Sequence, residues 1–262
     1  TLGRFEDQET LYQYLSDDLP GDMEEYLAHG ITSIKSVGDI PKAFIPARDR
    51  INRGELPGPR VFLAGPVLSA PGGHPGASIY RNNAWLRELS SRELTTEEGA
   101  RSEIHQLAEL GVDAIKFVYH GSADDAKPYL LAPGMPIRKI SSEVMKATID
   151  EAHQLGLPVT AHTAELEDAV EVLEAGCDGL EHGATRSLIE DETLGALLLE
   201  KQALYGPTPS GYINDNPGMA DTLLPNVKRL AEQGVRMVLG TDRGPARGGS
   251  GLDTLKELEL MV

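Results

Sequence analysis

The chain has 262 residues, of which 41 are acidic and 24 basic, giving a formal net charge of −17. This excess of negative charge argues against binding nucleic acid or an anionic membrane through a basic face. Cys177 is the only cysteine, which excludes an intramolecular disulfide and favours a cytoplasmic location. No apolar stretch approaches the roughly 20 residues that span a bilayer, and the first residues lack a signal-peptide pattern.

One local pattern recurs in chain order: a helix, a glycine and then an apolar strand. A glycine after the last helical turn adopts positive φ without a steric clash, and continuous apolar runs are typical of parallel strands covered on both faces. The pattern occupies residues 24–37, 103–119, 148–162, 169–182 and 227–242.

Two further strands are predicted at 60–65 and 203–208. Seven strands alternating with helices indicate an α/β fold. An open doubly wound sheet is the alternative architecture, but no G-x-G-x-x-G follows the first strand. We therefore predict a (β/α)8 TIM-type barrel that is incomplete, with strands two to eight visible and the first missing. Residues 1–262 would form one barrel domain.

Polar side chains predict where two of the helices begin. Ser141 or Ser142 would cap the helix before residue 156, and Thr163 would cap the next one, whose first turn is acidic. The last residues, LKELELMV, form an apparent helix. Together with the first residue, which is not methionine, this ending favours a fragment of a longer protein.

Histidines close two neighbouring strands: His162 follows LPVTA and His182 follows DGLE. In a barrel the chemistry sits at the carboxyl ends of the strands. One such histidine could simply cap its strand by hydrogen bonding. Two at equivalent ends favour metal ligation, because neutral imidazole is a common Zn²⁺ ligand. Asp242, after the last apolar strand, could be a metal ligand, a general base or both.

Lys116 lies within the apolar strand AIKFV. Burying an ammonium group there is costly unless the charge is paired or removed. The lysine could pair with an acid or extend to solvent. Alternatively it could be uncharged, as a Schiff base or as an N-carboxylated carbamate, and the nearby histidines favour the metal-binding carbamate.

The sequence resembles the amidohydrolase superfamily, specifically its imidazolonepropionase-like and prolidase-like (Xaa-Pro dipeptidase-type) branch. The motifs that carry the resemblance appear in the family's order over nearly the whole chain. They are GITSIKSVGD (30–39), GPRVFLAGPVLSAPGGH (58–74), GVDAIKF (111–117), VTAHTAELEDAVEVLEAGCDGLEHG (159–183) and VLGTD (238–242).

The resemblance implies the roles of four residues. Lys116 would be carboxylated and bridge two Zn²⁺ ions, His162 and His182 would bind the second ion, and Asp242 would bind the first and act as the catalytic proton shuttle. The chain departs from the family in having no His-x-His, which completes the first metal site, and no β-sandwich. One ion, or none, is therefore conceivable in this chain.

The function implied is a metal-dependent hydrolase that cleaves an amide-type C–N bond with a metal-bound hydroxide. Its small-molecule substrate would be a dipeptide or an N-acyl amino acid. The alternatives are a carbamate, phenylurea or cyclic-amide hydrolase, a deaminase, which Lys116 argues against, and a catalytically inactive truncated barrel. A homo-oligomer is possible.

The remaining polar residues near the strand ends divide into two groups. His74, Tyr119, His120 and Arg243 are candidate substrate contacts. Four other residues are expected to be structural, from their positions on helices or in local packing: His29, Trp85, His105 and His153.

Overall fold

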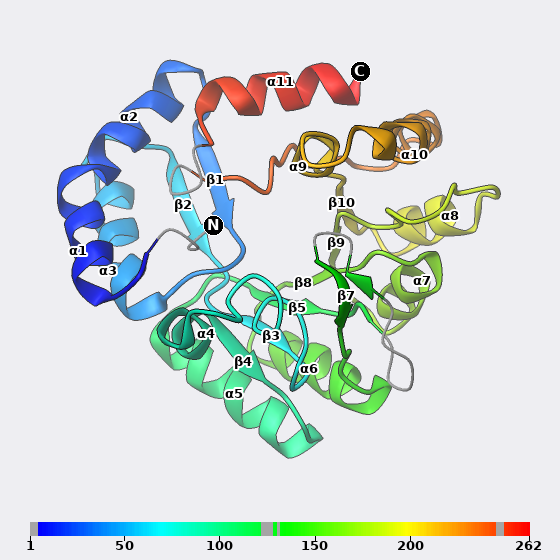
Figure 1. The fold of residues 1–262 in the computed structure, drawn as a ribbon, viewed down its shortest axis with the longest axis horizontal. Coiled ribbons are helices and arrows are strands. Elements are labelled where there is room, and N and C mark those ends of the chain that lie inside the picture. Colours follow the sequence, from blue (N-terminus) through cyan, green and yellow to red (C-terminus); the bar gives the residue numbers. More distant parts are fainter. Residues whose placement is uncertain (1–4, 122–127, 130–131, 245–248) are drawn as a thin grey trace.

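We describe residues 5–121, 128–129, 132–244 and 249–262 of the chain in a computed structural model (Figure 1). Strands lie at the centre of the molecule and helices surround them. A six-stranded parallel sheet has the order β10-β9-β8-β5-β3-β4, and β1 and β2 form a separate parallel pair. The strands are β1 (Ser33–Ser36), β2 (Arg60–Leu63), β3 (Val67–Ser69), β4 (Ser91–Glu93), β5 (Ile115–Val118), β8 (Val159–His162), β9 (Gly179–Glu181) and β10 (Leu204–Gly206).

Most of the helices follow strands and cover the outside of the sheet, as in barrel folds. They are α1 (Gln8–Asp17), α2 (Leu19–Ala28), α3 (Pro41–Asn52), α4 (Ala84–Ser90), α5 (Glu97–Leu110), α6 (Ser142–Gln154), α7 (Leu166–Glu174), α8 (Thr193–Glu200), α9 (Pro209–Ile213), the 3₁₀ turn η1 (Pro217–Met219), α10 (Ala220–Glu232) and α11 (Gly251–Met261).

The predicted helix ends are largely confirmed. The five glycines of the repeated pattern all have positive φ, between 73° and 101°. Ser141 caps α6 by accepting a hydrogen bond from the backbone N–H of Val144. The Thr163 cap is wrong: Glu165 is the N-cap residue of α7, and the hydroxyl of Thr163 donates instead to the carbonyl oxygen of Gly183.

The sheet does not close into a barrel among the described residues. The segment after α10, predicted as a strand, makes only one isolated parallel bridge, between Met237 and Tyr205 of β10. That part of the strand prediction is wrong, since a strand needs a ladder of such pairs. No described strand pairs with the other edge of β1, so the structure is an incomplete (β/α)8 barrel.

Exposure alternates along β2, whereas every residue of β5, β8 and β9 is buried. In β2, Val61 and Leu63 are buried, whereas Phe62 is 47% exposed. The alternation follows from the pleat of a strand, which turns successive side chains to opposite faces. The main apolar core lies under β5, β8 and β9, and a second cluster joins α1–α4 to β1 and β2.

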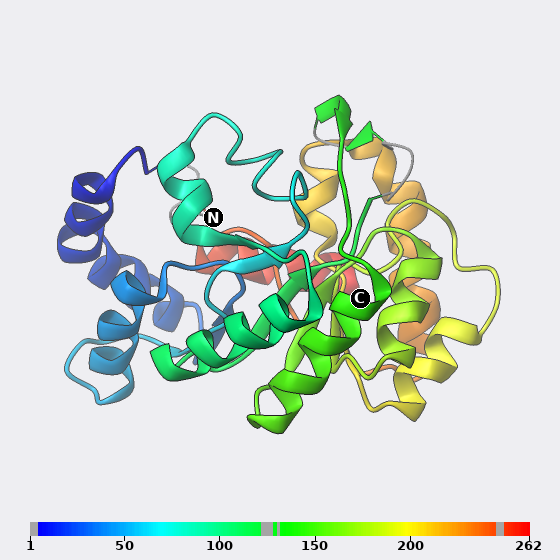
Figure 2. The same ribbon diagram turned by 90° about the horizontal axis from the view of Figure 1, so that it is seen from below.

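The antiparallel hairpin β6 (Pro128–Tyr129) and β7 (Ala132–Pro136) projects from the rest of the molecule (Figure 2). Among the described residues, no helix has both the length and the apolar character needed to cross a bilayer.

Candidate functional site

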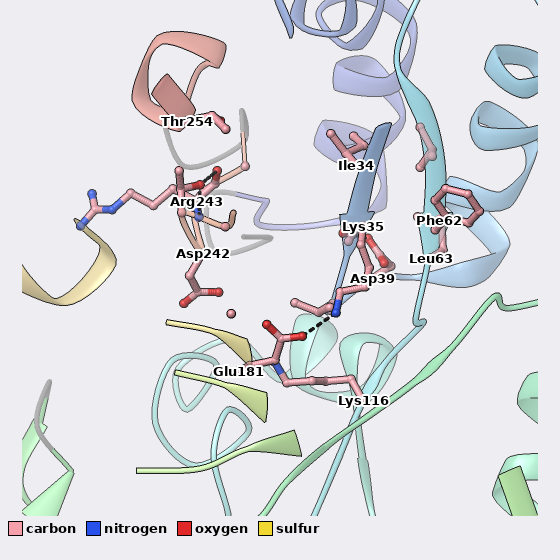
Figure 3. A pocket seen from close by; sticks show the side chains of 18 of the residues that line it. Ile34, Lys35, Asp39, Phe62, Leu63, Lys116, Glu181, Asp242, Arg243 and Thr254 are labelled. Atoms are coloured by element: carbon pink, nitrogen blue, oxygen red, sulfur yellow. Dashed lines mark hydrogen bonds and ion pairs between the residues drawn. The ribbon is translucent and has the colours of Figure 1, made fainter. Parts of the chain in front are cut away.

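A cavity of about 730 Å³ opens inside the incomplete barrel (Figure 3). Its volume is within the range of small-molecule sites in proteins. The predicted residues that line it are His74, Lys116, His162, His182, Asp242 and Arg243. The structure therefore brings six of the eight predicted site residues to one cavity.

The parallel register explains why these side chains meet. Lys116 of β5 is aligned with Thr160 of β8, and His162 of β8 is aligned with Glu181 of β9. Because side chains alternate along a strand, Thr160 and His162 face the same side of the sheet. Neighbouring strands thus stack their polar side chains in two rows on the inner face.

Three other histidine rings gather around His162. The centroid of its ring lies 4.5 Å from that of His182, 4.9 Å from that of His74 and 5.7 Å from that of His120. All four side chains are buried. His74, which the sequence places in a loop, is thus packed against the strand-end pair instead of being solvated.

Burial keeps three of these imidazoles uncharged near neutral pH. It lowers the pKa of His74 and of His162 far below the ordinary value, and neighbouring histidines add to the effect. Burial also lowers the pKa of His182 to about 4, although Asp242 opposes this shift. A neutral imidazole has a free lone pair, which is the form that binds a metal ion.

His182 is oriented by a residue that follows the next strand. Its Nδ1 atom lies 2.5 Å from Oγ1 of Thr208, which follows β10. A partner on one ring nitrogen fixes the ring and directs the other nitrogen towards a possible ligand. Both residues have positive φ, 70° for His182 and 49° for Thr208, as does Asp242 at 53°. Non-glycine residues rarely adopt this conformation, and those that do are often found at functional sites.

Lys116 is only 4% exposed. Burial lowers the pKa of its amine, and the acids Glu181 and Asp242 counteract part of that shift. The close-up shows the carboxylates of Glu181 and Asp242 turned towards the same space (Figure 3).

Glu181 is central to the charges of the cavity. Its Oε1 atom accepts hydrogen bonds from Nζ of Lys35 at 2.6 Å and from Oγ1 of Thr160 at 2.9 Å. Burial would raise the pKa of this carboxyl, but Lys116 and Lys35 outweigh burial and lower it to about 2. Glu181 therefore stays ionised inside the barrel.

These donors fit a metal ion in part. His162, His182, Asp242 and Lys116 supply nitrogen and oxygen donors of the kinds that Zn²⁺ takes, within one cavity. Over the part of the chain that the structure describes, however, no three His, Cys, Asp or Glu side chains converge closely enough to hold an ion. The cavity contains the elements of a metal site without a complete ligand set.

The other predicted contacts divide into two groups. Arg243 lines the cavity, but its Nη2 atom pairs with Asp215 at 2.9 Å, and its guanidinium extends away from Asp242 (Figure 3). Tyr119 and His120 do not line the cavity. Tyr119 belongs to the apolar core, and Nζ of Lys139 lies 4.4 Å from the centre of its ring.

The histidines expected to be structural each pair with an acid, and His29 also lines the cavity. His29 contacts Glu25, Nε2 of His105 lies 2.8 Å from Glu151, and Nε2 of His153 lies 2.8 Å from Asp178. Trp85 packs, partly buried, against the second apolar cluster. None of the four lies among the strand-end histidines around His162.

Sequence reasoning missed four residues of the site. Lys35 lies in the strand ITSIKSV, and the criterion that singled out Lys116, a lysine within an apolar run, would have found it. Asp39 follows β1 as Asp242 follows its own apolar run. Glu181 directly precedes His182, in a motif from which only the histidine was predicted as a site residue. Only the contact between Thr208 and His182 could not be predicted from the residues around Thr208, because it depends on how two neighbouring strands pair.

The chain is similar in sequence and in structure to several known hydrolases. The sequence is 26% identical to ochratoxinase from Aspergillus niger over 274 residues, 91% of this chain and 52% of that protein. The structure is similar to a Xaa-Pro dipeptidase with bound methionine (TM-score 0.73, 24% identity, 92% of this chain and 61% of the other). It is also similar to a putative prolidase from Bifidobacterium longum (TM-score 0.71, 27% identity, 96% and 61%).

The chain spans about half the length of the curated ochratoxinases that it matches. Residues 6–262 match the amidohydrolase family, almost all of the sequence. The structural similarities agree with this assignment, and with the incomplete barrel. The chain therefore belongs to the amidohydrolase family.

Proposed function

We propose that this protein is a metal-dependent hydrolase that cleaves an amide-type C–N bond in a small molecule. The observation that supports this most directly is the packing of His162 against His182, with ring centroids 4.5 Å apart, beside Lys116 and Asp242. Family membership and the names of the similar proteins, among them a Xaa-Pro dipeptidase, point the same way. A dipeptide or an N-acyl amino acid is the proposed substrate.

His162 and His182 would hold one metal ion and Asp242 would bind the other where two are present, with Zn²⁺ as the proposed ion. When bound, Zn²⁺ would polarise the scissile carbonyl and lower the pKa of a water molecule. The lowered pKa of Lys116 increases the share of uncharged amine, the form that can be N-carboxylated. The carbamate would add a fourth side chain with oxygen donors.

Asp242 is the proposed proton carrier. It lines the cavity beside the proposed metal ligands, and a carboxylate there can accept a proton from the nucleophile and return it to the leaving nitrogen. The neutral histidines are poor proton donors near pH 7, because burial disfavours their charged form. This leaves the acid–base role to the aspartate.

Metal analysis of purified variants tests the proposal. Lys116→Ala should lose most of the zinc bound by the wild type, and hydrolysis of a dipeptide library should disappear with it. Lys146→Ala, on the exposed face of α6, is the matched control and should retain both. Unchanged zinc content in Lys116→Ala would remove Lys116 from the metal site.

A second candidate is a barrel without catalysis. The absence of three converging ligands among the described residues favours it. Wild-type protein that binds no zinc and hydrolyses no substrate would support this candidate. A third candidate, a carbamate, phenylurea or cyclic-amide hydrolase, shares the metal chemistry and differs only in substrate.

We also propose that residues 1–262 form one domain, that the protein is cytoplasmic, and that it can form a homo-oligomer. Limited proteolysis would test the first point and sedimentation the last. For the site itself, we predict two metal ions bridged by carboxylated Lys116.

A further inference from the structure

Asp39 is a buried acid in the cavity that the proposed chemistry does not use. It lies three residues after β1, at the carboxyl ends of the strands, and only 3% of its surface is exposed. It lines the same cavity as Lys116 and His162. Asp39 and the proposed metal ligands therefore lie in one continuous cavity.

The backbone of Asp39 is fixed between two strands. Its N–H group donates a hydrogen bond of 2.8 Å to the carbonyl oxygen of Gly65, just after β2. The hydroxyl of Ser36 donates a hydrogen bond of 2.6 Å to Oδ1 of Asp39. The carboxyl group thus has a defined orientation, which is the requirement for selective recognition of a ligand.

The second oxygen of the Asp39 carboxyl group, Oδ2, takes no part in the hydrogen bond with Ser36. Oδ2 is buried, and no described residue gives it a hydrogen bond or an ion pair. A buried polar atom without a partner is unfavourable, and is expected to have one in the functional state. Lys35 contacts Glu181, and Lys116 interacts with both Glu181 and Asp242, whereas no described lysine or arginine forms an ion pair with Asp39.

Apolar side chains form part of the cavity that Asp39 lines, together with polar ones such as Ser36 and Arg48. Its walls include Met23, Tyr26, Ile34, Phe44, Phe62 and Tyr80. A cationic group with an apolar chain complements such a site: the charge would contact the carboxylate, and the chain would cover apolar surface.

We propose that Asp39 binds a protonated amine of the substrate. This inference rests on the proposed function for the identity of the reaction, and it narrows the substrate class to unblocked dipeptide-like molecules with apolar side chains. Ser36 is the positioning residue that orients the carboxylate. Neutral carbamates and phenylureas would gain nothing from this contact.

Binding of leucinol tests the site without any hydrolysis, because leucinol carries a primary amine and no scissile amide. The comparison compound is 4-methylpentan-1-ol, which has the same alkyl chain without the amine. In calorimetric titrations at pH 7.5, Asp39→Asn should weaken leucinol binding by about tenfold or more, the usual effect of losing a charge-assisted hydrogen bond. Binding of the alcohol should be equal in the two proteins.

Two further variants sharpen the result. Ser36→Ala keeps the negative charge of Asp39 but removes the donor that orients it, and should weaken leucinol binding by about two- to fivefold. Glu200→Gln is the charge-matched control, because the side chain of Glu200 is 71% exposed. It should leave leucinol binding unchanged. If Asp39→Asn does not fold, Ser36→Ala decides alone.

Kinetics separate this inference from the proposed function. For leucyl-leucine, Asp39→Asn should raise KM and leave the KM for N-acetyl-leucyl-leucine unchanged. If the wild type hydrolyses neither peptide but binds leucinol in an Asp39-dependent way, the proposed function fails and the amine site stands. Leucinol binding that is absent in the wild type, or unaffected by Asp39→Asn, overturns the amine site.

Discussion

Lys35 and Glu181 lie 146 residues apart in the sequence and meet inside the barrel, with Nζ of the lysine 2.6 Å from Oε1 of the glutamate. The contact joins β1, a strand of the separate two-stranded sheet, to β9 of the six-stranded sheet. It therefore links the two sheets across the cavity. Glu181 also compensates the charge of buried Lys116.

Loss of Glu181 should destabilise the protein more than loss of Lys35. Glu181→Gln leaves two lysines without their shared acid, whereas Lys35→Met leaves Glu181 with Lys116. Breaking a buried ion pair lowers the free energy of unfolding by about 3–5 kcal/mol. Because the side chain of Lys35 is 38% exposed, solvent screening reduces this cost. We therefore expect a loss of about 1–3 kcal/mol for Lys35→Met and a larger loss for Glu181→Gln. Urea denaturation measures both.

The exposed pair Lys228–Glu232 on α10 is the matched control. Glu232→Gln should change the free energy of unfolding by less than about 0.5 kcal/mol, because solvent screens such pairs. A double-mutant cycle on Lys35 and Glu181 should give a clear coupling energy. Additive effects of the two substitutions would mean that the contact contributes nothing.

Thr208→Val should weaken zinc binding while leaving the fold intact. The substitution keeps a β-branched side chain but removes the hydroxyl next to Nδ1 of His182, so the ring loses its fixed orientation. Loss of such a contact behind a ligand typically costs about 10- to 100-fold in metal affinity. Competition with a chelator measures the affinity, and exposed Thr193→Val serves as the control. Equal affinity in both variants would show that Thr208 does not orient the ligand.

Asp39 should make the protein less stable as pH rises. Burial raises the pKa of this carboxyl from 3.8 to about 6. The folded state therefore favours the protonated acid, so stability is full below pH 3.8, falls as pH rises to about 6, and is constant above that. The shift of about two units corresponds to about 3 kcal/mol.

Asp39→Asn should remove this dependence and be more stable than the wild type at pH 7.5 in the absence of ligand. Denaturation midpoints at pH 4 and pH 7.5 give the comparison, with Glu200→Gln following the wild type. A wild type and an Asn variant with parallel pH profiles would contradict the raised pKa.

Gly183→Ala should be strongly destabilising. Gly183 has a φ of +69°, and an added Cβ would lie 2.2 Å from a ring carbon of Tyr205, whose hydroxyl donates to the carbonyl oxygen of His182. The conformation costs about 1–2 kcal/mol and the overpacking about 1–3 kcal/mol. Thermal unfolding measures the loss.

Gly156→Ala separates the two causes. Gly156 has a similar φ of +73°, but nothing lies within 4 Å of an added Cβ. Only the conformational cost of about 1–2 kcal/mol should remain. Equal losses at both glycines would mean that the Tyr205 contact relaxes freely.

The sequence alone determined the repeated unit and the residues at the strand ends. The helix–glycine–strand pattern predicts the helix ends, because positive φ is a local property of glycine. His162, His182, Lys116 and Asp242 are recognisable since each interrupts or ends an apolar run. The incomplete barrel also follows from counting such runs.

Only the tertiary structure decided which side chains share the cavity. Lys35 and Glu181 meet because β1 and β9 face each other across the open barrel. Neither strand's own sequence indicates that the two side chains are close in space. Likewise the segment after α10 reads as a strand but forms a single bridge, because strand formation depends on a pairing partner. The environment of Asp39, a buried carboxylate with one oxygen unpaired, exists only once β1, β2 and the cavity walls are assembled.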